Sequence, residues 1–134
     1  MLIKEKIHAP EKLNDVVLIG EVLIDKIYEK SSETSRYIMG GSTSNISVNL
    51  KHLEQKPIFV GAVGNDQYGD EILQKLKMNG IDIENINIVN DKTSFVEIDK
   101  SEGSPIPKFF RSSDNQIYFT KELEAHIKKS KILH

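Results

Sequence analysis

The fold of this chain is decided by the stretch GGSTSN at residues 40–45, which leads directly into a segment of helical spacing. Two adjacent glycines let a backbone approach a ligand that any Cβ atom would keep away. Asn45 adds a donor and an acceptor at the start of the expected helix. The stretch therefore predicts a site that binds hydroxyl groups. A tight turn that needs glycine for a positive φ would account for the same pair.

Composition excludes several classes of protein. The 134 residues suffice for about one domain, and their net charge of −2 argues against a nucleic-acid partner, which would require a basic face. The absence of cysteine excludes disulfides, cysteine-based zinc sites and a catalytic thiol. Charged residues throughout the first segment argue against a signal peptide, and no run approaches the ~20 apolar residues of a membrane span. We expect a soluble, cytoplasmic protein with no membrane partner.

Short apolar runs alternate with amphipathic segments in the first half of the chain. Residues 15–20 (DVVLIG) and 58–61 (IFVG) are typical of strands buried on both faces. A helix is predicted from Ser44, and Pro57 ends it. Its apolar stripe consists of Ile46, Val48, Leu50 and Leu53.

A second glycine cluster, GAVGNDQYG at residues 61–69, precedes another predicted helix. We expect Asp70 to be its N-cap, Asp66 to be a turn residue, and Asn79-Gly80 to end it. Its stripe consists of Ile72, Leu73 and Leu76. Two strand–helix units with buried strands indicate an α/β fold with a parallel sheet and flanking helices.

The remaining segments are mostly extended in pattern. Four are predicted as β-structure: residues 24–37, with a turn at SSETS (31–35), 81–89, 93–98 and 107–110. A last helix is expected from Thr120, its N-cap, to Lys131. The final residues, KILH at 131–134, then become apolar and extended.

No metal or nucleotide motif is found in the sequence. The four histidines (His8, His52, His126 and His134) lack the mutual spacing of a metal site, so we predict no metal ligands. Gly20 follows a strand, but Glu21 and Val22 break the Gly-x-Gly-x-x-Gly pattern of a dinucleotide site, and the P-loop pattern is absent. No nucleophile–base pair is visible, and we predict no catalytic residue.

Three ordered motifs resemble the opening of the ribokinase-like (PfkB) carbohydrate kinases: GEVLID at residues 20–25, GGSTSN at 40–45 and VGNDQYG at 63–69. Residues 76–81, Thr93 and FFRSSD at 109–114 also fit the family in order and spacing. The resemblance implies a partial parallel sheet with flanking helices plus a small β lid, formed by about residues 24–39 and 93–110. It also implies phosphoryl transfer from ATP to a sugar hydroxyl, with Mg²⁺.

The resemblance assigns sugar-binding residues. Asp25 and Asn45 would bond hydroxyls, while Gly40 and Gly41 would let the ring approach. Arg111 resembles an arginine that some acid-sugar and ketose kinases place on the substrate. Asp25 could instead be a turn residue at a strand end, and Arg111 a solvent-facing strand residue.

Two departures from the family pattern concern the sugar. Ribokinase tends to have asparagine where this chain has Leu23, and lysine where it has Ser42. These changes disfavour ribose and make the chain more similar to fructokinase and 2-keto-3-deoxygluconate kinase, without identifying the sugar.

A further departure concerns catalysis. The family's Gly-Ala-Gly-Asp segment, which supplies the anion hole and the base, does not occur in this sequence. We therefore expect residues 1–134 to be the N-terminal, sugar-binding and lid portion of a truncated ribokinase-like domain, inactive alone. ATP and Mg²⁺ would serve a full-length enzyme, and we expect neither to bind the residues present here.

A sheet cut in mid-course would leave an open edge. We expect a homodimer or higher oligomer, paired through the lid, as in some family members, or through that edge. The alternative function is a non-enzymatic module that binds sugar weakly or only associates with itself.

Overall fold

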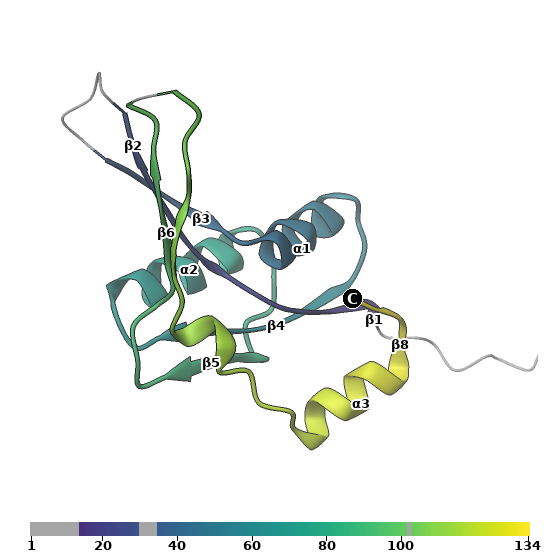
Figure 1. Ribbon diagram of the computed structural model, residues 1–134. Coiled ribbons are helices and arrows are strands. Elements are labelled where there is room, and N and C mark those ends of the chain that lie inside the picture. The colour runs from purple at the N-terminus through teal and green to yellow at the C-terminus, as the bar shows by residue number, and fades with distance from the viewer. Residues whose placement is uncertain (1–13, 30–34, 102) are drawn as a thin grey trace, which may run out of the picture.

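The computed structural model describes residues 14–29, 35–101 and 103–134 (Figure 1). Its strands are β1 (Asn14–Ile19), β2 (Leu23–Tyr28), β3 (Arg36–Gly40), β4 (Pro57–Gly64), β5 (Ile86–Val89), β6 (Phe95–Asp99), β7 (Lys108–Phe110) and β8 (Ser130–Leu133). Its helices are α1 (Ser42–His52), α2 (Gln67–Met78), α3 (Lys121–Lys129) and the 3-10 turn η1 (Ser113–Asn115). In this part of the chain the strands form two sheets, ordered β5-β4-β1-β8 and β3-β2-β6-β7. We call them the core sheet and the outer sheet.

The core sheet is parallel throughout. β4 pairs with β1 and β5, and β8 pairs with the other side of β1. The predicted strand at residues 15–20 is confirmed as β1. The strand predicted at 58–61 is longer than expected, because β4 continues to Gly64 and is buried along its whole length. Both glycines of this segment, Gly61 and Gly64, therefore lie within a fully covered strand.

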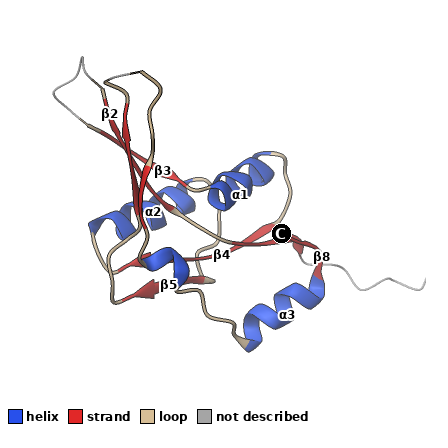
Figure 2. Cartoon of the chain, viewed as in Figure 1, coloured by secondary structure: helices blue, strands red, loops and turns tan. Residues whose placement is uncertain are grey.

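Helices cover both faces of the core sheet (Figure 2). Val16 and Leu18 of β1 pack with residues of α1 and α2, such as Leu76, on one face. Val17, the residue between them, packs with Leu123 of α3 on the other face. This alternation follows from the two-residue period of a strand. The predicted parallel α/β sheet with flanking helices is confirmed.

α1 differs from its prediction in its start and its buried face. It begins at Ser42 rather than Ser44, and Leu53 is 68% exposed instead of completing the stripe. The buried side chains of α1 are Thr43, Ser44 and Ser47. Their small size allows close packing of the helix, and the Ser44 hydroxyl donates to the Gly40 carbonyl at 2.8 Å. The other predicted stripe residues, Ile46, Val48 and Leu50, pack at the margin of the core.

α2 begins earlier than predicted. Asp66, in an extended conformation, is the N-cap, and its Oδ1 accepts from the Gly69 amide at 2.9 Å. The prediction of Asp70 as N-cap is therefore wrong; Asp70 is an exposed residue of the first turn. The predicted stop is confirmed, since Asn79 is the C-cap and Gly80 has φ 72°.

The last part of the chain follows its prediction with shifted limits. Of the predicted strand at 81–89, only β5 forms. Thr120 is the N-cap of α3, as predicted, and its Oγ1 accepts from the Leu123 amide at 3.1 Å. α3 ends at Lys129 rather than Lys131, because the chain extends there into β8 and joins the core sheet.

The outer sheet contains one parallel and two antiparallel pairs. β2 runs parallel to β6, whereas β3 pairs with β2 and β7 with β6 in antiparallel fashion. The extended segments predicted at 24–37, 93–98 and 107–110 correspond to its four strands. The turn predicted at 31–35 lies almost entirely outside the described residues. Figure 1 shows this sheet projecting away from the core sheet.

Candidate functional site

The carboxylate of Asp25 lies directly against the backbone of Gly40, at the end of the outer sheet nearest α1. Asp25 is in β2, and Gly40 is the last residue of β3. A Cβ atom on Gly40 would come within 2.4 Å of Asp25 Oδ2. Real Cβ atoms do not make contacts this short, so glycine at residue 40 is what allows the carboxylate to occupy this position.

Gly41 turns the chain from the outer sheet into α1. Its φ of 106° is a conformation that favours glycine, and a Cβ there would lie 2.6 Å from the Glu21 carbonyl oxygen. The next amide, that of Ser42, donates to Glu21 Oε1 at 3.4 Å. A carboxylate at this place favourably faces the positive end of the helix dipole.

Asn45 lies in the first turn of α1. Its amide donates to the Gly41 carbonyl at 3.1 Å, and its side chain is exposed. The structure thus places Asp25 in contact with Gly40, with Gly41 next in the chain and Asn45 one helical turn further on.

Arg111 is joined to this turn through Glu21. Its Nη1 donates to Glu21 Oε2 and also to Asp114 Oδ2. These hydrogen bonds, first that with Asp114 and then that with Glu21, raise the pKa of Arg111 above its ordinary value. The guanidinium carbon lies 4.9 Å from the centre of the Phe109 ring. Arg111 is therefore an ion-paired residue rather than an isolated solvent-facing one.

Asp114 is held by the β6 end of the outer sheet. Its side chain is only 5% exposed, and it accepts from the Ser94 hydroxyl. Ser94 Oγ in turn accepts from the Ser112 amide at 2.8 Å. Burial raises the pKa of Asp114, but the hydrogen bonds from Ser94 and Arg111 outweigh it, so the pKa lies below its usual value. Asp114 is thus a buried, ionised carboxylate.

Asp25 lies between apolar side chains. The pairing register aligns it with Ile38 of β3 on one side and, through Val96 of β6, with Phe109 of β7 on the other. Paired residues share one face of a sheet, and both Ile38 and Phe109 are exposed. Partial burial raises the pKa of Asp25, and the charge of Glu21 raises it further. A carboxylate flanked by apolar groups suits a ligand with both hydroxyl and C–H faces.

Sequence reasoning did not assign roles to Glu21, Ser94 and Asp114. Glu21 and Asp114 stand inside the two motifs GEVLID and FFRSSD, which was the available signal. The ion pair between Glu21 and Arg111, however, joins residues 90 positions apart.

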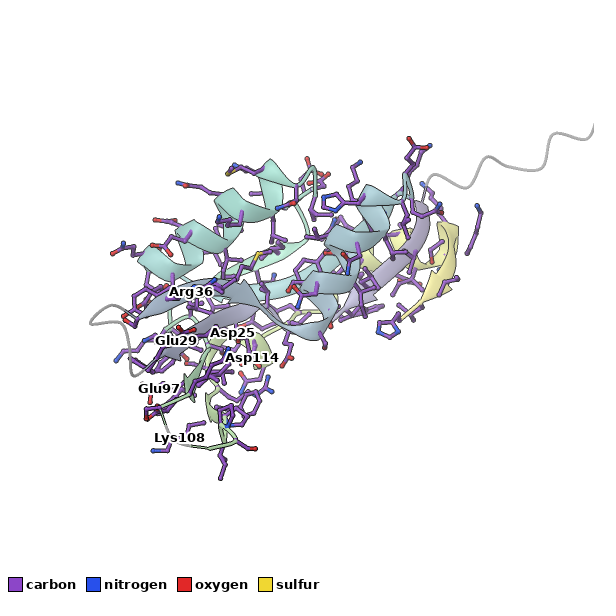
Figure 3. All side chains as sticks on the ribbon, turned by 90° about the horizontal axis from the view of Figure 1, so that it is seen from above. Asp25, Glu29, Arg36, Glu97, Lys108 and Asp114 are labelled. Atoms are coloured by element: carbon purple, nitrogen blue, oxygen red, sulfur yellow. The ribbon has the colours of Figure 1, made fainter. Side chains whose placement is uncertain are left out.

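Figure 3 shows Asp25 and Asp114 toward the centre of the molecule, whereas Glu97 and Lys108 lie toward its edge.

Two further observations concern the residues described, which are 14–29, 35–101 and 103–134. They contain no group of three or more His, Asp or Glu side chains placed to hold a metal ion. None of their helices is both long and apolar enough to cross a membrane.

The family of the chain follows from comparison with known proteins. Residues 13–134 match the model of the pfkB family carbohydrate kinases. The chain belongs to this family of carbohydrate kinases, and its fold is ribokinase-like, as the motifs indicated.

Two relatives illustrate the match in sequence. The ATP-dependent 6-phosphofructokinase of Thermoanaerobacterium thermosaccharolyticum is 38% identical over 135 residues, covering 97% of this chain and 42% of that protein. The 5-dehydro-2-deoxygluconokinase of Clostridium tetani is 33% identical, covering 89% of this chain and 38% of that protein. The chain thus spans less than half the length of these relatives.

Solved structures show the same fold. A fructokinase of Halothermothrix orenii superposes with a TM-score of 0.79 at 29% identity, over 90% of this chain and 45% of that one. A fructokinase with bound ATP from Xylella fastidiosa gives a TM-score of 0.78 at 24% identity, over 90% of this chain and 38% of that one. The latter likeness concerns the fold alone.

Proposed function

We propose that the chain is the N-terminal, sugar-binding portion of a kinase that transfers a phosphoryl group from ATP to a sugar hydroxyl. The observation that carries this proposal is the Asp25 carboxylate packed on Gly40 beside the first turn of α1. Family membership supports the reaction class.

The binding residues would be Asp25, Gly40, Gly41, Asn45 and Arg111. An ionised carboxylate only accepts hydrogen bonds, so Asp25 binds hydroxyl groups as donors. The amide of Asn45 both donates and accepts, while Gly40 leaves room for the Asp25 carboxylate and Gly41 for the turn into α1 beside the Glu21 carbonyl. Hydrogen bonds to an ionised group are stronger than those between neutral groups, which favours Asp25 as the main anchor.

The outer sheet would be the lid over this sugar, with segments at about residues 24–39 and 93–110. The exposed side chains of Ile38 and Phe109 share a face with Asp25 and would cover the apolar faces of the ring. Residues 1–134 would then form one portion of a single ribokinase-like domain.

ATP and Mg²⁺ would act in a full-length enzyme. Phosphoryl transfer depends on positioning and on neutralising the developing charge, and it needs a base or positioning group for the hydroxyl. The residues around Asp25 fit a hydroxyl ligand better than a nucleotide, because their side chains include three carboxylates, Asp25, Glu21 and Asp114. We therefore propose no ATP or metal ligand, no catalytic residue, and no activity for the chain alone. The need for ATP favours the cytoplasm as its location.

The second candidate is a non-enzymatic module that binds sugar weakly or associates with itself. It is favoured by β8, an edge strand of the core sheet on which Ile132 is 60% and Leu133 53% exposed. An apolar groove beside it is lined by Val16, Leu18, Ile46, Leu50, Gln55, Ile132 and His134. Self-association through this edge or through the lid is compatible with either function.

The sugar site is tested by NMR titration of the ¹⁵N-labelled chain with fructose, ribose and inositol. Shifts of the amides of Asp25, Gly40, Gly41 and Asn45 are expected, and Asp25→Asn should weaken binding at least about tenfold. Asp70→Asn, an equal charge change on the exposed first turn of α2, is the matched control. Shifts that avoid these amides, or equal effects of both variants, would contradict the site.

A further inference from the structure

The guanidinium of Arg111 is already bound on two sides. Nη1 bridges Glu21 Oε2 and Asp114 Oδ2, and the Phe109 ring lies 4.9 Å from Cζ. Asp114 is fixed by Ser94 and buried, while Glu21 is fixed by the Ser42 amide. An arginine that bound an anionic substrate would be expected to present its donors to the ligand. Here the donors of Nη1 point to two protein carboxylates, whose combined charge exceeds that of the guanidinium.

The charge around the site is negative. Two carboxylates, Glu21 and Asp114, pair with the single guanidinium of Arg111, and the carboxylate of Asp25 lies close enough to Glu21 for that charge to raise its pKa. The next cation along β2, Lys26, belongs to the opposite face of the outer sheet, where its Nζ lies 3.7 Å from the centre of the Phe95 ring and 4.8 Å from that of Tyr68. Arg36 shares the Asp25 face but pairs with Ile27, about 7 Å further along the strand.

We infer that the acceptor bound at this site is an uncharged sugar or polyol, and that Glu21 and Asp114 exclude phosphorylated or carboxylated acceptors by holding Arg111. This inference rests on the proposed sugar site. An anionic acceptor at Asp25 would lie beside one carboxylate and near a second, Glu21, while the positive charge of Arg111 is already balanced by Glu21 and Asp114. Like charges brought together in a partly desolvated site repel strongly. Uncharged hydroxyls, in contrast, supply the donors that carboxylates need.

Selection of this kind is achieved by repulsion of the wrong ligand rather than by attraction of the right one. Of the two carboxylates that pair with Arg111, Asp114 is held in a fixed position by its burial and by its hydrogen bond with Ser94. Glu21 is the less buried of the two partners, since 26% of its side chain is exposed against 5% for Asp114. Glu21 is therefore the residue to change.

The test titrates the ¹⁵N-labelled chain with fructose and with fructose 6-phosphate, and adds gluconate as a carboxylated probe. Fructose is expected to bind at least about tenfold more tightly than either anion, with shifts at Gly40, Gly41 and Asn45. In Glu21→Gln, the ratio of the dissociation constant for the anions to that for fructose should fall at least about threefold, because Arg111 then keeps a single carboxylate partner. The matched control is Glu97→Gln, which removes the same charge from β6 at a position in register with Lys26 and Lys108.

The outcomes separate the inference from the function on which it rests. Fructose 6-phosphate or gluconate binding the wild-type chain as tightly as fructose, with shifts at the same amides, would overturn the inference and leave the sugar site standing. Equal changes in Glu21→Gln and Glu97→Gln would overturn the role of Glu21. No shift at these amides with any of the three probes would overturn both the inference and the proposed site.

Discussion

Two hydrogen bonds join Asp66, at the start of α2, to Thr93, which lies two residues before β6 of the outer sheet. Asp66 Oδ2 accepts from the Thr93 amide at 2.9 Å, and Oδ1 accepts from the Thr93 hydroxyl at 2.6 Å. The same Oδ1 caps α2 through Gly69. One aspartate therefore ties a helix of the core to the outer sheet, where the sequence predicted only a turn residue.

The first prediction concerns this contact. Asp66→Ala should lower the free energy of unfolding by about 2–4 kcal/mol, because it removes an N-cap and two further hydrogen bonds to a charged acceptor. Asp70→Ala, four residues further on and exposed, should change it by no more than about 0.5 kcal/mol. Urea unfolding followed by circular dichroism measures both. Equal effects would mean that Asp66 is not the cap.

The second prediction concerns pH. Burial raises the pKa of Asp66, but hydrogen bonds from Thr93 and Gly69 outweigh it and hold that pKa below its usual value. A carboxyl with a lower pKa in the folded state stabilises the fold fully above the unfolded value of about 3.9. That contribution is lost as the pH falls through 3.9 toward the folded pKa. Unfolding free energy should therefore fall between about pH 5 and pH 3, and the fall should be shallower in Asp66→Asn. An unchanged slope in the variant would exclude Asp66 as a source of the acid sensitivity.

The third prediction concerns the contact of Asp25 with Gly40. Gly40→Ala should destabilise the fold by about 1–3 kcal/mol, since its Cβ would overlap the carboxylate. In the double variant with Asp25→Ala the overlap is removed, so the two changes should be less than additive by at least about 1 kcal/mol. Strict additivity in urea unfolding would show that the carboxylate does not occupy this position.

The fourth prediction concerns assembly. The chain should sediment as a homodimer or higher oligomer at micromolar concentration, because apolar side chains are exposed on the outer sheet and on β8. Pairing through the outer sheet is expected first, so Phe109→Asp should dissociate the assembly more than Ile132→Asp does. Met78→Asp, on the exposed face of α2, is the control. A monodisperse wild-type monomer would contradict the prediction.

The fifth prediction concerns activity. The purified chain should show no sugar-dependent consumption of ATP above background in a coupled assay, because the sequence lacks the Gly-Ala-Gly-Asp segment of its family. Activity that follows the protein quantitatively through two chromatographic steps would refute this.

Much of the fold was predictable because its signals are local. The buried runs of β1 and β4 and the caps at Thr120 and Gly80 depend on neighbouring residues, and the structure has all of them. The limits of α1 were not predictable, because its buried face is made of serine and threonine rather than of apolar residues. Close packing against the strand ends, not hydrophobicity, selects those side chains.

The residues of the candidate site were predictable only where they belong to a motif of the family. Asp25 and the two glycines stand in such motifs, and the register of the strands brings Asp25 and Gly40 together. The pairing of Arg111 with Glu21 could not be deduced, because Arg111 follows β7 and Glu21 follows β1, and only the three-dimensional path of the chain brings them together. A single sequence contains no signal for the distance between two such residues.

The connection between β1 and β2 is only three residues long, Gly20, Glu21 and Val22, and it is the shortest bridge between the two sheets in the described chain. Val22 within it is fully buried, so packing against the core holds this connection in place. Glu21, on the same bridge, contacts both the first turn of α1 and Arg111. Any rotation of the outer sheet about this connection would move Glu21, and would therefore change its contacts with the Arg111 guanidinium and with the first turn of α1. The angle between the two sheets and the ion pairing of Arg111 at the site are thus coupled: a change in one requires a change in the other.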